Sequence, residues 1–153
     1  LRGVEFIERG DGVGLDDIER AESRYRVHIG QGDVVLLRTG QLGQRERSGP
    51  VDPAKAGSAG PLPELLPLVH ERGVAVLGSD TGNDVMPTGY QRFSNPIHQI
   101  GIVGMGLWIL DNAWLDDLAA ACQARQRWEF LISIAPLRLK NATGSPVNPI
   151  AVF

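Results

Sequence analysis

Short apolar runs of the kind found in buried β-strands recur along this chain, separated by segments with helical spacing. Val34–Leu37, Val74–Leu77 and Leu107–Leu110 are continuous apolar runs, which are typical of strands buried on both faces of a sheet. Apolar residues at helical spacing predict helices over Leu15–Tyr25 and Pro61–Arg72, and an internal proline is expected to kink or restart the second helix. Because strands alternate with helices and several connections are short, we predict the α/β class with a mixed sheet.

The remaining segments fit the same alternation. We expect further strands over Gly3–Glu8, over Phe130–Ile134 and at the end of Gly144–Phe153, and a helix over Trp114–Gln126. Gln41–Gly60 holds several glycines and prolines but few large apolar groups, and we predict a long surface loop there. Such a loop is either a functional lid or a mobile insertion.

The stretch Asn95–Asn112, NPIHQIGIVGMGLWILDN, is where a histidine and a carboxylate frame an apolar run. Asparagine followed by proline is a helix-start signal, so we predict a short helix over Pro96–Val103 that the following glycine stops, then a strand that ends at Asp111. The β-branched residues of this stretch also permit a hairpin. Both interpretations bring His98 opposite Asp111, and we therefore expect the two side chains to face one cavity.

Length and composition limit the classes of protein to consider. A chain of 153 residues suits one domain, and a net charge of −3 gives no support to a nucleic-acid or membrane-surface partner. The apolar run Ile100–Leu110 is interrupted by glycines and is too short to span a bilayer. A single cysteine, Cys122, excludes an internal disulfide and fits a cytoplasmic protein. No signal peptide opens the chain, and its first residues read as a strand, so we expect the sequence to begin inside a fold.

A metal centre needs three or more ligands, and the chain has three histidines. His70 lies near the end of a predicted helix and His28 in a polar connection, positions typical of ordinary surface histidines. His98 and Asp111 remain as candidate ligands, because a carboxylate that follows a buried strand must reach a wet cavity or carry a partner. No H-x-x-x-H pattern is present, so the chain alone cannot complete a metal site.

The segment Gly78–Pro87, GSDTGNDVMP, follows a predicted strand at the end where open α/β sheets collect ligands. It lacks the G-x-x-x-x-G-K-[ST] pattern and contains no lysine, which disfavours a phosphate loop. A turn stabilised by Asp and Asn side chains explains it better. A small-molecule site formed by Ser79–Asp84 is the weakest hypothesis. No G-x-S-x-G motif indicates a serine hydrolase.

Six segments follow one another along the chain in this order: RGVEF, GDVVLLRTG, HERGVAVLGSDTGNDVMP, PIHQIGIVGMGLWILDN, WEFLISIAPLRL and GSPVNPIAVF. Their order resembles that of the putative cyclase family, which includes bacterial kynurenine formamidases and isatin hydrolases. The resemblance implies a swivelling β/β/α-type fold. It also implies a metal-dependent hydrolase, with manganese or zinc, that opens cyclic amides or cleaves formamides and related amides.

In that family the main metal ligands come from an upstream motif of the form H-x-G-T-H-x-D, which this sequence lacks. The resemblance thus implies that residues 1–153 are the C-terminal portion of a single cyclase-like domain, incomplete without an upstream segment. His98 matches a later histidine that binds or adjoins the metal, and it would orient the attacking water or move its proton. Asp111 stands where glutamate is usual, and it would bind the metal or hold His98 in one tautomer. Trp108 lies close enough in sequence to line the substrate pocket.

The hypothesis is therefore a metal-dependent hydrolase of a small-molecule amide, in which this chain supplies part of the active site and residues outside it supply most metal ligands. We expect a homo-oligomer or a companion upstream segment to cover the apolar strands. The alternative is a non-catalytic structural or interaction remnant that has lost the metal-binding half. A start codon directly before Leu1, with no companion chain, would favour the remnant.

Overall fold

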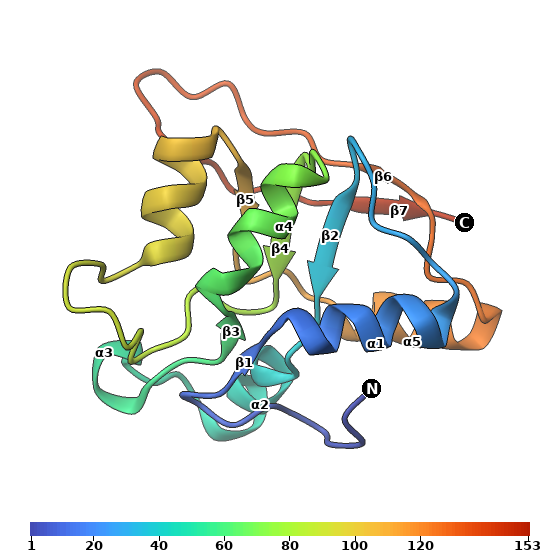
Figure 1. Ribbon diagram of the computed structural model, residues 1–153, viewed down its shortest axis with the longest axis horizontal. Coiled ribbons are helices and arrows are strands. Elements are labelled where there is room, and N and C mark those ends of the chain that lie inside the picture. The colour runs from blue at the N-terminus through green and yellow to red at the C-terminus, as the bar shows by residue number, and fades with distance from the viewer.

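A three-stranded parallel sheet with the order β2–β4–β5 lies at the centre of the molecule (Figure 1). The computed structural model describes residues 1–153. Its strands are β1 (Gly12–Val13), β2 (Val34–Leu37), β3 (Gly60–Pro61), β4 (Val76–Ser79), β5 (Trp108–Leu110), β6 (Leu131–Ser133) and β7 (Ile150–Val152). Its helices are α1 (Leu15–Tyr25), α2 (Gln41–Ser48), α3 (Pro53–Ala56), the 3-10 helix η1 (Pro63–Leu65), α4 (Leu66–Glu71), the π-helix η2 (Ile97–Gly104) and α5 (Asp116–Arg125).

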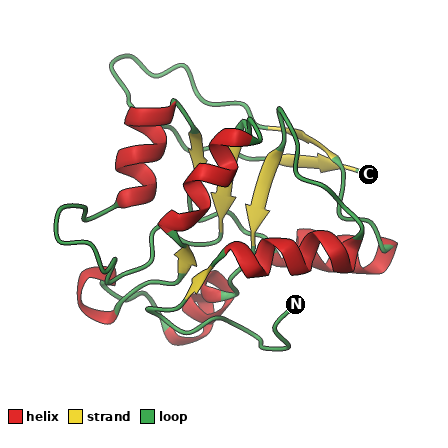
Figure 2. Cartoon of the chain, viewed as in Figure 1, coloured by secondary structure: helices red, strands yellow, loops and turns green.

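Two smaller sheets accompany the central one. β1 pairs with β3 in parallel, and β6 pairs with β7 antiparallel (Figure 2). Parallel and antiparallel pairs therefore occur together with helices, as predicted for the α/β class, although they form three separate sheets. None of the helices is long and apolar enough to cross a bilayer.

The register of the central sheet sorts its side chains onto two faces, because successive residues of a strand point to opposite sides. Val35, Leu77 and Ile109 are aligned across the three strands and pack on the side of α4 and η2. Val76 and Trp108 are aligned on the other side, where they border a wide groove. The strands were expected to be buried on both faces, and this expectation is wrong: β2 is only half-buried along its length and Trp108 is exposed.

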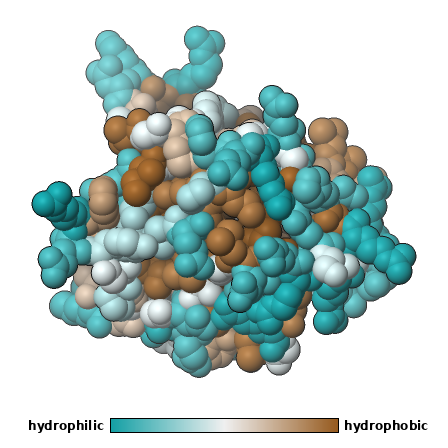
Figure 3. Space-filling view, viewed as in Figure 1, coloured by the Kyte–Doolittle hydropathy of each residue, from teal (hydrophilic) through white to brown (hydrophobic).

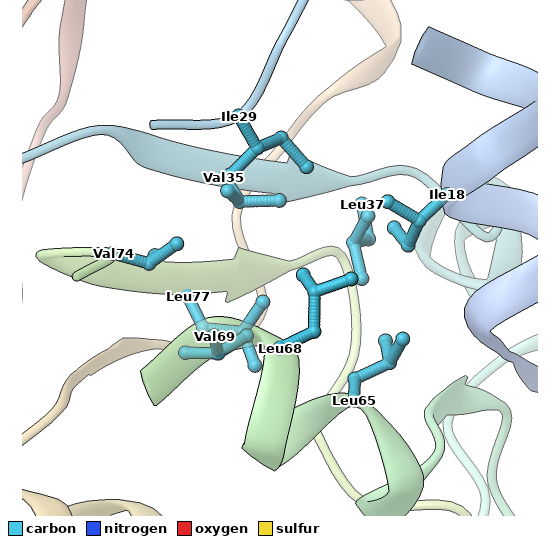
Figure 4. Close-up of a pocket in the computed structure, with 9 residues that line it drawn as sticks. All are labelled: Ile18, Ile29, Val35, Leu37, Leu65, Leu68, Val69, Val74 and Leu77. Atoms are coloured by element: carbon cyan, nitrogen blue, oxygen red, sulfur yellow. The ribbon is translucent and has the colours of Figure 1, made fainter. Parts of the chain in front are cut away.

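Helices α4 and η2 cover the first face of the sheet, and α4 crosses in front of β4 in Figure 1. The core there is formed by Leu66, Val69, Val74, Leu77, Ile97 and Leu107. A small gap lies between α1, α4 and the sheet, and Figure 4 shows the hydrophobic side chains that line it. Its volume is about 10 Å³. A gap of this size holds no more than a single water, so it is a packing defect and not a ligand site. Figure 3 shows brown side chains near the centre of this same face, surrounded by hydrophilic ones.

Several predicted elements formed and others were displaced. The helix α1 has the predicted bounds, and the segment 61–72 restarts as η1 and α4, with Pro67 in the first turn of α4. β4 begins two residues later than the predicted strand Val74–Leu77, and α5 is shorter than Trp114–Gln126. β6 lies within Phe130–Ile134, and β7 begins directly after Pro149.

The strand predicted over Gly3–Glu8 is absent. Gly3 adopts a positive φ of 73°, which interrupts an extended chain, and the segment joins the end of β2 through one backbone hydrogen bond, from Ile7 to Thr39. The nearest strand along the chain is β1, which pairs with β3.

The long loop predicted over Gln41–Gly60 is also wrong, because the segment contains α2 and α3. Asp80 accepts hydrogen bonds from the backbone N–H groups of Thr39 and Gly40 where α2 begins. Asp52 caps α3 by accepting from the N–H of Ala54, and Pro53 occupies the first helical position. The pair Asp52–Pro53 is a helix-start signal in the sequence. The loop was predicted because the segment has few large apolar residues.

Candidate functional site

A helix start, a loop and the end of a strand together place a histidine between two carboxylates. His98 lies in the first turn of η2, Asp111 directly follows β5, and Asp84 lies in the loop after β4. The predicted helix over this stretch is confirmed as η2 and the alternative hairpin is wrong. Asp84 contributes to the start of η2, because its Oδ1 accepts the backbone N–H of Ile97 at 2.8 Å, one of the donors that a helix start leaves without a partner.

The imidazole of His98 contacts a carboxylate on each of its nitrogens. Nδ1 lies 2.6 Å from Oδ2 of Asp84, and Nε2 lies 3.1 Å from Oδ2 of Asp111. The hydrogen bonds to Asp111 and Asp84 raise the pKa of His98 to about 10, against the opposing effect of burial. The two carboxylates thus favour the imidazolium form of His98, in which each nitrogen donates to one of them. The expectation that His98 and Asp111 face each other is confirmed.

Asp111 is also held from its other side. The fully buried Asn83 donates through Nδ2 to Oδ1 of Asp111 and to the carbonyl of Leu110, both at 2.8 Å. Burial disfavours the charge of Asp111, but the hydrogen bonds from His98 and Asn83 outweigh it and lower the pKa of this carboxyl group. Oδ1 of Asn83 has no hydrogen-bond partner, which is unusual for a buried polar atom.

The neighbouring carboxylate of Asp80 has a structural task. Its two oxygens accept from the N–H and hydroxyl of Thr39 and from the N–H of Gly40, all within 2.8 Å. Ser79 and Thr81 hydrogen-bond to each other. The side chains of Ser79, Asp80 and Thr81 are thus engaged within the fold, which supports the interpretation of this part of the loop as a turn.

The donor atoms at this site fit part of a divalent metal centre. Imidazole nitrogen and carboxylate oxygen are ligands of both zinc and manganese, and Nε2 of His98 and Oδ2 of Asp111 face each other. No group of three His, Cys, Asp or Glu side chains in this chain is arranged around one ion. Asp84 cannot be the third ligand, because it occupies the opposite nitrogen of the ring. The chain therefore contributes two candidate ligands, and the metal-binding roles of His98 and Asp111 stay predictions.

Trp108 does not lie where the sequence placed it. Its side chain is on the groove face of the central sheet and is 65% exposed. It borders the groove together with Asp111, whereas His98 does not line that groove. The structure therefore does not bring Trp108 into a common pocket with His98, and its role in binding substrate stays a prediction.

Asn83 and Asp84 were not among the predicted site residues. Both were assigned to a turn, because no local pattern connects Asp84 to His98, 14 positions later, or Asn83 to Asp111, 28 positions later. The usable signal was their place after a strand of the central sheet, where functional side chains collect.

Residues 4–83 match the sequence model of the family described as "Putative cyclase". A solved structure titled as a novel cyclase is 28% identical, with a TM-score of 0.84, and the match covers 96% of this chain and 48% of that one. Isatin hydrolase A from Labrenzia aggregata, bound to benzyl benzoate, is 30% identical with a TM-score of 0.73, covering 94% of this chain and 55% of that one.

Isatin hydrolase A from Ralstonia solanacearum shares the fold, with a TM-score of 0.72 at 23% identity, and the match covers 94% of this chain and 53% of that one. This chain thus spans about half the length of the solved structures that it matches. No curated protein matches it.

Proposed function

The chain belongs to the putative cyclase family, and we propose that it supplies part of the active site of a metal-dependent hydrolase. The substrate class is a cyclic amide, a formamide or a related amide. One observation carries the proposal: His98 and Asp111 present a nitrogen and an oxygen to each other, and a second carboxylate holds the far side of the ring. The likeness to isatin hydrolases supports the substrate class, because isatin is a cyclic amide.

We propose Nε2 of His98 and Oδ2 of Asp111 as the atoms that would hold manganese or zinc. When bound, such an ion polarises a carbonyl group and makes an adjacent water more acidic. The proton on Nε2 must leave before this atom can hold an ion. The aspartate at position 111 is one methylene shorter than glutamate, so its reach depends on the hydrogen bond from Asn83 that fixes its other oxygen.

The proposed catalytic role of His98 falls on the same nitrogen. Nδ1 is engaged by Asp84, so Nε2 is the atom that can orient the attacking water or move its proton. A variant that separates the two roles is His98→Ala. Loss of bound metal would assign Nε2 as a ligand, whereas retained metal with lost turnover would assign it to proton movement.

The other ligands of the ion are proposed to come from polypeptide outside these residues. The open face of the central sheet supports this part, since a groove of about 1440 Å³ extends from β4 and β5 to β6 and β7 and is lined mostly by hydrophobic residues. Trp108, Leu137 and Leu139 border this groove as exposed apolar side chains, which are the kind of groups that mark an interaction surface when they gather in one place. A companion segment or further copies of the chain would cover it.

The proposed location is the cytoplasm. The single cysteine, which is free and buried, accords with it.

The test measures metal and turnover on the longest product of the gene. We expect about one or two equivalents of manganese or zinc by elemental analysis, and hydrolysis of isatin or an aryl formamide, by analogy with metal hydrolases. His98→Ala and Asp111→Asn should abolish turnover, while His28→Ala, an exposed histidine elsewhere, serves as the matched control. A product that binds neither ion and hydrolyses no amide would overturn the proposal and support the non-catalytic remnant.

A further inference from the structure

Two consecutive residues in one loop hold the two candidate ligands from behind. Asn83 contacts Asp111, and Asp84 contacts His98. Both residues are almost completely buried, at 0% and 2% exposure, whereas the groups they hold reach the surface. A buried pair behind a more accessible pair is the arrangement expected of groups that orient ligands rather than bind substrate.

The side chains of Asn83 and Asp84 each also hydrogen-bond to the backbone next to the candidate ligand that they contact. Asp84 uses Oδ2 for the ring of His98 and Oδ1 for the N–H of Ile97, the residue immediately before it. Asn83 uses the two hydrogens of Nδ2 for Oδ1 of Asp111 and for the carbonyl of Leu110, again the residue immediately before. A side chain tied both to a group and to its backbone fixes the position of that group in two directions.

The backbone of the loop is adapted to this task. Asn83 has a positive φ of 53°, a left-handed conformation that asparagine tolerates better than most residues. In this conformation the Asn83 side chain reaches the end of β5, and the Asp84 side chain reaches the start of η2. The loop thus joins two elements that the chain visits later.

We infer that Asn83 and Asp84 are positioning residues that together set the orientation of Asp111 and His98. As a result, Nε2 of His98 and Oδ2 of Asp111 face each other. This inference deepens the proposed function, and its consequence for metal affinity rests on that function. The orientation itself does not, since the hydrogen bonds that set it join residues of this chain. One experiment therefore tests the orientation, and a second tests the metal affinity.

The first experiment observes His98 in the metal-free chain by ¹H–¹⁵N NMR of histidine-labelled protein. The short contact between Nδ1 and Asp84 predicts a downfield Nδ1–H resonance that exchanges slowly with water. Asp84→Ala should remove this resonance and Asp84→Asn should shift it, whereas Asp111→Asn should retain it.

The matched control is Asp80→Asn, which changes a buried carboxylate of the same loop that contacts Thr39 and Gly40. It is expected to destabilise the fold but to keep the Nδ1–H resonance of His98. If Asp80→Asn and Asp84→Ala remove the resonance equally, or if neither does, positioning by Asp84 is refuted.

The second experiment measures zinc and manganese affinity on the longest product of the gene. Groups that orient ligands typically contribute 10–100-fold in metal affinity, so Asp84→Ala and Asn83→Ala should each weaken binding by about that factor. In a double-mutant cycle, Asp84→Ala should cost little further affinity once His98 is alanine. Equal losses in both backgrounds would show a general structural role and overturn the inference.

The two proposals can fail separately. A wild-type product that binds no metal, but whose Nδ1–H resonance depends on Asp84, would overturn the proposed function and leave the positioning intact. If the wild-type product binds metal and turns over substrate, and neither property changes in Asp84→Ala or Asn83→Ala, the proposed function stands and the positioning inference is overturned.

Discussion

The two faces of the central sheet differ in how much of their apolar surface the chain itself covers. On the face toward α4 and η2, Leu77 and Ile97 are 1% and 0% exposed. On the groove face, Trp108 stands in the neighbouring strand at 65% exposure. The covered face holds the elements together and carries the loop that positions His98. The open face also carries many apolar side chains, but they border a groove instead of a packed core.

The ribbon β6–β7 repeats this contrast on a smaller scale. Leu131, Ile150 and Val152 are 71%, 57% and 54% exposed on one of its sides, while Ile132 and Ala151 border the groove on the other. A two-stranded ribbon is only marginally stable by itself. Apolar side chains therefore stand on both sides of this ribbon.

The largest loss of stability is expected for a truncation in the covered core. Leu77→Ala should lower the free energy of unfolding by about 2–5 kcal/mol, because it removes a fully buried side chain and leaves a cavity. Urea denaturation of the chain measures this change. Leu131→Ala is the matched control with the same chemistry at an exposed site, and a similar loss in both variants would contradict the assignment of the two faces.

A smaller effect concerns the start of α1, which packs on the covered side. The hydrogen bond from Arg2, with further ones from Gly14 and Arg20, outweighs burial and lowers the pKa of Asp17 from 3.8 to about 2. A lowered pKa stabilises the fold above the unfolded value and loses this contribution as the pH falls through the folded one. About 2 kcal/mol of stability should therefore disappear between pH 5 and pH 2.

Acid titrations of unfolding free energy test this contribution. Asp17→Asn should flatten this part of the pH profile, whereas Asp52→Asn, at an exposed helix cap, should leave it nearly unchanged. An unaltered profile in Asp17→Asn would show that the ion pair with Arg2 does not persist in solution.

The smallest effect is expected on the open face. Trp108→Ala should change the unfolding free energy of the chain alone by about 0.5 kcal/mol or less, because exposed side chains lose little when truncated. Thermal or urea unfolding decides this. A loss as large as that of Leu77→Ala would mean that the chain closes over the groove in solution.

Local patterns were sufficient for elements whose cause is local. The helix α1 and the strand β2 have the predicted bounds, since helical spacing and a continuous apolar run each identify one conformation. The closeness of His98 and Asp111 also followed from one stretch of chain, because a short helix that returns as a strand allows few arrangements.

Other features depended on contacts between distant segments. Val76 and Trp108 belong to runs that are apolar at every position, so no alternation could show which side chains would stay uncovered. Helix α2 begins directly after Thr39 and Gly40, whose backbone N–H groups donate to Asp80 about forty residues later in the chain, and no local pattern shows this contact. Asp84 likewise meets His98 only once β4 and η2 are in place.

The lone thiol of the chain offers a practical route to the open face. Cys122 is 4% exposed, and burial raises the pKa of its thiol, so alkylating reagents should modify it slowly. A second cysteine in place of Trp108 would then be the fast-reacting site of the molecule. Its labelling rate, with and without added polypeptide, would report directly whether the groove is occupied.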